Sequence, residues 1–401
     1  MPKSADWPAH GSELRAWTPS GRGPKPDRVF TEVVVSLPPM IAAETYTARS
    51  DTAELLEDAA RDIRALELTS GAKLGALGQF LVRTESVSSS KIESIEAKTD
   101  DYARALAGIK SNASATSMAA AASAIQQMID SAGTTGMIRL EDVLVAHEIL
   151  MRDDVLDGRY AGQFRTMQNW IGGSDYSPRG AVHVPPPPEM VSDYMVDLVT
   201  FANRDDISAV AQAAIVHAQF ESIHPFTDGN GRIGRALINA VLRRRGLTTR
   251  TITPLASAMV ADRQNYFSLV NNYRRGDLDP FVRSVAISAQ ISSLAAADSA
   301  DELGKLPELW LSRTSARAGS AARAIIAVLL QHPVLSAAAA HALVGGTESS
   351  VYSAMDRLEG DGIIHEVTDR KRDKVWAATA VLDEMVTLAD RIERDVRDDV
   401  T

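Results

Sequence analysis

The feature that most constrains this chain is residues 224–235, where a glycine-rich turn runs directly into the start of a helix. Three glycines, one carboxylate, one amide and two guanidiniums stand within these twelve residues. Apolar residues then recur at helical spacing from Ile233 to Leu242. Glycines ahead of a helix let backbone N–H groups converge on an anion, and the helix dipole favours negative charge at that end. The stretch therefore predicts a phosphate-binding helix N-terminus.

The side chains of this stretch indicate what happens to the phosphate. Arg232 and Arg235 are three residues apart, so they lie on one face of the first turns and can clamp phosphate oxygens. Asp228 stands where a carboxylate can hold Mg²⁺ beside those phosphates. His224 carries an imidazole, whose ordinary pKa near ~6.5 lets it accept a proton at neutral pH. Together they predict a site that grips a nucleotide and deprotonates an incoming hydroxyl. The alternative is a helix-capping turn with incidental charges.

This spacing resembles the signature of the Fic family, His-Pro-Phe-x-Asp/Glu-Gly-Asn-Gly-Arg-x-x-Arg, and matches it at every defined position. The resemblance implies a mainly α fold, with a Fic-type helical core and a β-hairpin flap. It implies transfer of AMP from ATP, the co-substrate, to a protein Ser, Thr or Tyr hydroxyl. His224 would be the catalytic base and Asp228 would hold Mg²⁺, the cofactor. The implied ATP-binding residues are Gly229, Asn230 (through its amide, in the anion hole), Gly231, Arg232, Ile233, Gly234 and Arg235, with Ile171, Gly172 and Tyr266 from elsewhere.

An inhibitory element is expected upstream of the signature. Residues 89–93, from Ser89 to Glu93, resemble the family's inhibitory motif, Ser/Thr-x-x-x-Glu-Gly/Asn. The resemblance implies that Glu93 pairs with Arg235 and leaves ATP in an unproductive pose, because charge-assisted pairs of this kind are strong and geometrically selective. Ser94 stands where the family has Gly or Asn, which predicts weaker inhibition because a close approach is lost. The alternative is an ordinary solvated helix face.

A hairpin is expected between residues 164 and 184. Extended-type residues lead to Ile171, and Gly172 turns the chain before Val182, His183 and Val184. A proline run follows, which cannot lie centrally in a sheet. This pair resembles the Fic flap, which implies that Ile171 and Gly172 border the nucleotide while residues 182–184 align a target segment added as an edge strand. The alternatives are a surface hairpin without function and, for Tyr266, an ordinary core residue.

The remaining regions divide into consecutive parts. We expect an extended arm at 1–28, with disorder as the favoured alternative, and a helical region with the inhibitory helix at 29–112. The catalytic domain follows at 113–292, a helical linker at 293–319 and a C-terminal helix, able to pair subunits in a homodimer, at 381–401. Residues 320–380 resemble a winged helix-turn-helix, whose third helix would enter a major groove while the basic wing tip at 370–372 touches phosphate. Because that helix carries more acids than bases, a protein partner is nearly as well supported as DNA.

Composition limits the remaining possibilities. A net charge of −10 argues against non-specific binding of polyanions by the whole molecule. The absence of cysteine excludes disulfides and thiolate sites, which fits a cytoplasmic location. Neither an apolar leader nor a membrane-spanning run is visible, so we expect no membrane partner. Two other functions stay open: AMP removal or use of another nucleotide in the same site, and nucleotide sensing by a transcriptional regulator. Self-modification is a further possibility, but no acceptor is indicated.

Overall fold

The computed structural model describes residues 7–69, 74–109, 111–370 and 372–400, so Met1–Asp6 of the expected arm and Lys371 of the expected wing tip lie outside the described part. The chain forms two compact units built from interleaved segments. The first comprises Met1–Ala60, Gln127–Leu247 and Arg263–Ile287, and the second comprises Arg61–Gln126, Thr248–Asp262 and Ser288–Thr401. The expected domains were consecutive stretches, whereas each of these units is made of three separate segments of the chain.

The first unit contains the catalytic signature. Its elements are β1 (Gly11–Ala16), α1 (Lys25–Arg28), β2 (Glu32–Leu37), α6 (Leu140–Met151), η2 (Gly158–Tyr160), η3 (Pro188–Met190), α7 (Val191–Ala202), α8 (Ala209–Ile223), α9 (Asn230–Arg244) and α11 (Arg263–Arg274). Three helices continue from the residues of one unit into those of the other: α2 (Ser50–Thr69), α5 (Ala113–Thr135) and α12 (Asp279–Arg313).

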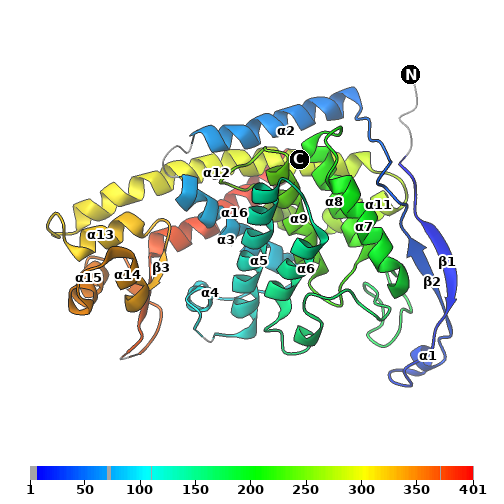
Figure 1. The fold of residues 1–401 in the computed structure, drawn as a ribbon, viewed down its shortest axis with the longest axis horizontal. Helices are drawn as coiled ribbons and strands as arrows, with labels where there is room; N and C mark the ends of the chain where they lie inside the picture. The colour runs from blue at the N-terminus through cyan, green and yellow to red at the C-terminus, as the bar shows by residue number, and fades with distance from the viewer. Residues whose placement is uncertain (1–6, 70–73, 110, 371, 401) are drawn as a thin grey trace. The chain divides into compact units, whose positions relative to one another are not determined.

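Helix α8 is the centre of the first unit, with α7, α9 and α11 packed against it (Figure 1). Alanines and branched apolar residues occupy most of α8, and every residue from Val210 to Ile223 is buried. Gly234 on α9 permits the closest approach, because a Cβ there would lie 2.9 Å from Glu221 Oε1 and 3.0 Å from the Phe220 ring. Close-packed interiors do not accommodate an extra methyl at such distances without a shift. Gly234 therefore serves the packing of α9 on α8, and the nucleotide contact expected of it stays a prediction.

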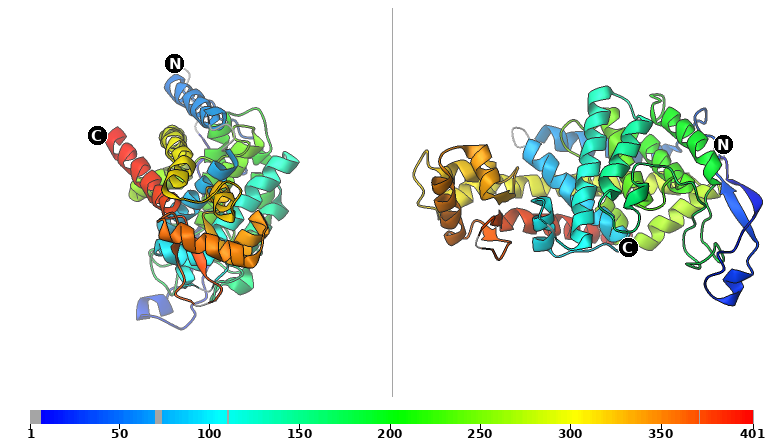
Figure 2. Two further views of the ribbon diagram at one scale, coloured as in Figure 1. Left: turned by 90° about the vertical axis from the view of Figure 1, so that its left-hand side faces the viewer. Right: turned by 60° about the horizontal axis from the view of Figure 1, so that its bottom comes forward.

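The described part of the N-terminal arm, residues 7–28, contains strand β1 and helix α1, which the alternative of disorder did not predict. Strand β1 pairs antiparallel with β2 in a register that places Leu14 opposite Val34. The hairpin, with α1 in the connection, is the dark blue ribbon at the right of the right-hand view in Figure 2. Trp7 packs its ring against Phe201 and Tyr273, and is 6% exposed. Aromatic side chains bury large areas, and this explains why a polar arm is held in place.

The second unit contains α3 (Leu74–Ile92), α4 (Thr99–Leu106), α10 (Leu255–Ala261), α13 (Ala321–Val328), β3 (Val334–Ser336), α14 (Ala337–Val344), α15 (Glu348–Gly360), β4 (His365–Glu366), β5 (Val375–Ala377) and α16 (Thr379–Val400). Helix α3, which leads to the expected inhibitory motif, packs against α10 and α16. Glu85 accepts the Ala256 N–H at 2.9 Å, where a carboxylate complements the N-terminus of α10. Ser88 and Ser257 join their hydroxyls at 2.8 Å.

The C-terminal part of the second unit has the three expected helices, α13, α14 and α15. Its sheet has three strands in the order β3-β5-β4, one more than the two expected, because β3 pairs antiparallel with β5. The region expected as a linker also differs, since α12 runs unbroken from Asp279 to Arg313 and includes most of it. In the described parts of the chain, we find no helix whose apolar stretch reaches the length needed to cross a bilayer.

Candidate active site

His224 is the C-cap of α8 and adopts a left-handed conformation, with φ 48° and ψ 61°. Non-glycine residues seldom hold this conformation, which costs on the order of 1–2 kcal/mol. The strain is maintained because the His224 N–H bonds to Phe220 O at 2.9 Å and because Pro225 follows, which disfavours a continued helix at the preceding residue. The helix thus ends abruptly and presents the imidazole at the start of the glycine-rich turn.

The turn after His224 is fixed through the backbone of Phe226. The Asn230 amide accepts the Phe226 N–H at 2.8 Å and donates to the Phe226 carbonyl at 2.9 Å. Asn169 donates to the same carbonyl at 2.9 Å. Asn230 is 2% exposed, so its amide shapes the turn from inside. The expected anion hole, formed by this amide together with the backbone of residues 229–231, stays a prediction.

His147 on α6 supports the same turn from the other side. Its ring lies parallel to Phe226, with 3.7 Å between the ring centroids. Nδ1 accepts the Gly162 N–H at 3.0 Å, so the proton of the neutral ring is on Nε2, which faces Asp228 O at 3.1 Å. Burial, together with nearby Arg232, lowers the pKa of His147 to about 4. His147 is therefore a neutral structural residue.

Gly229 begins α9 with φ 76°, a left-handed conformation that glycine adopts at no steric cost. A Cβ at this position would lie 3.0 Å from Leu150 and 3.1 Å from the sulfur of Met151. The first N–H groups of a helix have no partner within it, and they point along the axis towards this turn. The glycine therefore leaves room where the start of α9 faces an anion.

Two guanidiniums stand in the first two turns of α9. Arg232 is 4% exposed and Arg235 is 1% exposed. Their charge is felt by neighbouring histidines: after burial itself, Arg235 lowers the pKa of His217 to about 3. Both guanidiniums therefore lie in the first two turns of α9, next to the turn that carries Asp228.

Asp228 has a carboxylate that is 55% exposed and lies 3.7 Å from the Arg232 guanidinium, with one oxygen accepting the Gly229 N–H at 2.7 Å. Burial and the neighbouring carboxylates of Asp228 and Asp154 raise the pKa of Asp157, so the surroundings of Asp228 are electronegative. Within the described residues, no cluster of three or more His, Cys, Asp or Glu side chains is arranged to hold a metal. Mg²⁺ commonly takes one carboxylate together with substrate phosphates and water. Asp228 therefore fits a magnesium ion that arrives with a nucleotide.

The expected flap hairpin is present, with a bridge between Ile171 and His183. Its three expected target-facing residues differ in exposure: Val182 is 65% exposed, whereas His183 is 5% and Val184 is 8% exposed. His183 places Nε2 2.9 Å from Ser222 O, and Val184 packs with Val33 and Val35 of β2. The side chains of His183 and Val184 thus face the interior of the unit, whereas Val182 is exposed, and the alignment of a target peptide by this segment stays a prediction.

Tyr266 on α11 belongs to the core, as the alternative reading had it. It is 5% exposed, and its hydroxyl lies 2.9 Å from His217 Nε2, with the two rings stacked. Ile233 is likewise buried, and its N–H bonds to Gly229 O within the helix. Both positions were expected to bind ATP. Their side chains lie in the core around α8 and α9, and their contact with a nucleotide stays a prediction.

The expected inhibitory residues are at the end of α3 in the second unit. Ser89 is buried, and the turn after Ile92 bonds Ile95 N–H to Ser90 O at 3.0 Å. Ser94 adopts φ 60°, a left-handed conformation. Gly and Asn hold this conformation most readily, which explains the Gly or Asn of the motif by backbone geometry instead of close approach. The serine nevertheless forms the turn.

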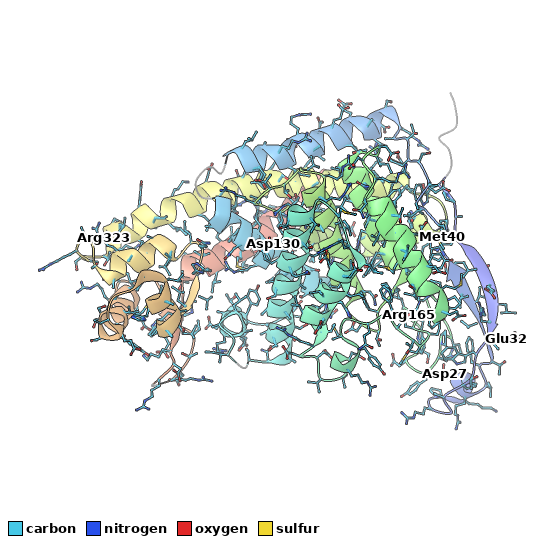
Figure 3. The ribbon with its side chains drawn as sticks, in the orientation of Figure 1. Asp27, Glu32, Met40, Asp130, Arg165 and Arg323 are labelled. Atoms are coloured by element: carbon cyan, nitrogen blue, oxygen red, sulfur yellow. The ribbon has the colours of Figure 1, made fainter. Side chains whose placement is uncertain are left out.

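Arg165 was not singled out from the sequence, since a lone arginine in an extended stretch has no informative spacing. It is 3% exposed and lies in the loop before the flap, as labelled in Figure 3. Its guanidinium donates to His224 O at 2.9 Å, to Pro186 O at 2.6 Å, to Met167 O at 3.3 Å and to Ile223 O at 3.4 Å. Burial lowers its pKa to about 10, so it remains charged at neutral pH. Arg165 thus links the strained His224 turn to both arms of the flap.

Comparison with known proteins finds relatives of the region that contains residues 224–235. The model described as the Fic/DOC family matches residues 137–242. The protein adenylyltransferase fic-1 of Caenorhabditis elegans is 32% identical over 158 residues, which are 39% of this chain and 28% of that protein. The protein adenylyltransferase Fic of Nematostella vectensis is 33% identical over 153 residues, 37% of this chain and 32% of that protein. The match therefore spans about a third or less of the curated relatives.

A solved structure shares the fold over most of the chain. The Fic family protein from Desulfovibrio desulfuricans G20 superposes with a TM-score of 0.54 and 19% sequence identity, covering 83% of this chain and 97% of that one. At this identity the likeness concerns the fold alone. The chain thus has a mainly helical, Fic-like fold with small antiparallel sheets.

Proposed function

Because this chain carries a Fic/DOC-family domain and is related to Fic protein adenylyltransferases, we propose that it transfers AMP from ATP to a Ser, Thr or Tyr hydroxyl of a protein. The observation that carries the proposal is the strained His224 turn, which leads directly into an anion-binding helix start with two buried arginines. An imidazole beside a phosphate site is the arrangement that a hydroxyl nucleophile requires.

The start of α9 would bind the phosphates of ATP. The backbone N–H groups of Gly229, Asn230 and Gly231 would take the α-phosphate, since they lie at the positive end of the helix dipole. Arg232 and Arg235 would orient the β- and γ-phosphates, because a planar guanidinium matches phosphate oxygens. Ile171 and Gly172 would border the nucleotide from the flap. Such alignment supplies most of the catalysis in phosphoryl transfer.

Asp228 would hold Mg²⁺, which neutralises charge on the phosphates and on the leaving pyrophosphate when it is bound. His224 would accept the proton of the target hydroxyl. The freed oxygen forms a bond to the α-phosphorus, and the bond between that phosphorus and the oxygen leading to the β-phosphate breaks. Pyrophosphate leaves with that electron pair, and AMP stays on the protein.

Glu93 would restrain this reaction by pairing with Arg235, the guanidinium that the γ-phosphate needs. A carboxylate on that guanidinium would make ATP bind without its productive alignment. The left-handed turn at Ser94 supports the proposal, because it gives the end of α3 the local geometry that a Gly or Asn would give.

The C-terminal part at 321–377 would be a winged helix-turn-helix, and we favour a protein partner for it over DNA. Helix α15 has Glu348, Asp356 and Glu359 against one cation, Arg357. On the wing, Lys374 pairs with Glu366 at 2.7 Å. Polyanion binding depends on cations that face the phosphates, and on α15, the helix that would enter a groove, carboxylates outnumber them.

Replacing Arg165 by Lys should lower the turnover number about tenfold to a hundredfold while the KM for ATP stays nearly unchanged. A single ammonium cannot reach the carbonyls of His224, Met167 and Pro186 together, so the base loses its alignment. Turnover should be normalised to ATP-binding sites, because a merely structural loss would reduce their number and leave turnover per site intact. The exposed Arg159→Lys serves as the control. Normal turnover per site in Arg165→Lys would remove this positioning role.

The reaction class is tested with ATP labelled at the α- or the γ-phosphate, using the whole chain with Mg²⁺ and a protein extract. We expect protein to become labelled from the α-position only. Label from the γ-position would indicate a kinase. Release of AMP from previously modified protein, without any forward labelling, would support the reverse reaction instead.

A further inference from the structure

A groove of about 490 Å³ lies beside the flap within the first unit. It is formed by three extended segments and the end of one helix: residues 10–12, 34–36 and 181–184, together with Asn271, Arg274 and Arg275 of α11 and its following turn. Val34 and Val182 line the groove. Their apolar side chains are 58% and 65% exposed. These two side chains give the groove an apolar surface that is open to solvent.

The hydrogen bonding of the flap directs a peptide into this groove. The strand with Val182 and His183 pairs with Ile171 on one side. On its other side, the Ser36 N–H of β2 donates to Val184 O at 2.8 Å. The chain's own β2 therefore takes the flap edge at Val184, where a target was expected to add as a strand. The place that remains for a target segment is the groove, which is lined by β1, β2 and the flap.

The groove is cationic although the chain as a whole is acidic. Its thirteen lining residues include Arg274, Arg275, His10 and His183 but no Asp or Glu, in a chain of net charge −10. Burial, and to a smaller extent the nearby charge of Arg274, lowers the pKa of both histidines, that of His10 to about 3. The two arginines therefore carry the charge of the groove at neutral pH. Arg274 is fixed by bonds to Asn271 at 2.8 Å and Glu221 O at 3.1 Å, with Glu221 as a nearby carboxylate.

Two residues that line the groove contact the last turn of α8, which leads to His224. Arg274 contacts Glu221 O and Ser222, in the last turn of α8. His183, which lines the groove, contacts Ser222 O at 2.9 Å, two residues before His224. A segment bound in the groove would consequently have neighbouring residues within reach of the His224 imidazole.

We infer that the groove binds an extended segment of the target protein, with an apolar side chain against Val34 and Val182 and an acidic side chain on Arg274 and Arg275. The inference rests on the proposed AMP transfer and specifies its substrate: the modified hydroxyl lies a few residues from an acidic residue. Charge complementarity of this kind gives specificity more than bulk affinity.

Binding of matched peptides tests this inference independently of catalysis. The probes are fluorescent dodecapeptides with a central Thr and flanking Leu and Asp or Glu, each paired with its Asn or Gln counterpart. The protein is the full-length His224→Asn variant, which prevents turnover. We expect the acidic peptides to bind about tenfold more tightly than their amide counterparts. Arg275→Glu should abolish that preference, and Val182→Asp should weaken both members of each pair.

Arg28→Glu, an exposed reversal of the same charge on α1 outside the groove, is the matched control and should keep the preference. Equal binding of acidic and amide peptides, equal loss in Arg275→Glu and Arg28→Glu, or tighter binding of an oligonucleotide would overturn the inference. Selective peptide binding without AMP transfer by the wild-type chain would leave the groove standing and refute the proposed reaction.

Discussion

Replacing His224 should lower AMP transfer by about two to four orders of magnitude while the affinity for ATP stays within about twofold. General-base catalysis contributes about 10²–10⁴-fold, and in the proposed function the phosphates would be bound by α9 and its arginines instead of by the imidazole. Transfer would be followed with α-labelled ATP, and ATP affinity by equilibrium binding to the same preparations.

The choice of substitution matters because His224 has φ 48°. Alanine would add strain there, whereas asparagine tolerates left-handed conformations and lacks a comparable base. Both His224→Ala and His224→Asn should be inactive, with His224→Asn closer to the wild type in thermal stability. His341→Ala, in α14 of the second unit, controls for loss of a histidine elsewhere. Undiminished transfer in His224→Asn would exclude His224 as the base.

Replacing Glu93 by Gly should raise transfer about tenfold to a hundredfold. Charge-assisted bonds contribute about 1.5–3 kcal/mol, and removing the carboxylate would free Arg235 for the γ-phosphate. The increase should appear in the turnover number, since ATP already binds in the restrained state. It would be measured as the initial rate of α-label incorporation at saturating ATP.

Ser94→Gly is the matched control for this increase, because it changes the adjacent residue in the same turn. Glycine adopts φ near 60° without cost, so the turn should become more stable and transfer should not rise. If Ser94→Gly activates as much as Glu93→Gly, the effect comes from loosening the turn and not from losing a carboxylate.

Local features of the sequence were sufficient for the core of the site. The end of α8 at Ile223 and the start of α9 follow from Pro225 and Gly229, whose backbone preferences act over a few residues. The flap hairpin was recognisable from its paired glycines. The left-handed Ser94 also agrees with the motif's Gly or Asn, although its reason became clear only from the dihedral angle.

Long-range packing could not be predicted in the same way. Arg165 gains its role from carbonyls that lie 21 and 59 residues away in sequence, at Pro186 and His224. Tyr266 appears suited to a ligand until its bond to His217 places it in the core. Strand β1 depends on pairing with β2, so a polar arm gave no indication of it. Such contacts are set by the fold as a whole.

The most direct test of the central claim compares α-label incorporation by the wild type, Glu93→Gly and the double variant Glu93→Gly/His224→Asn, with Mg²⁺ and equal amounts of ATP-binding sites. We expect weak labelling by the wild type, strong labelling by Glu93→Gly and none by the double variant. Strong labelling by the double variant would contradict His224 as the base, and labelling of none of them despite ATP binding would contradict AMP transfer itself.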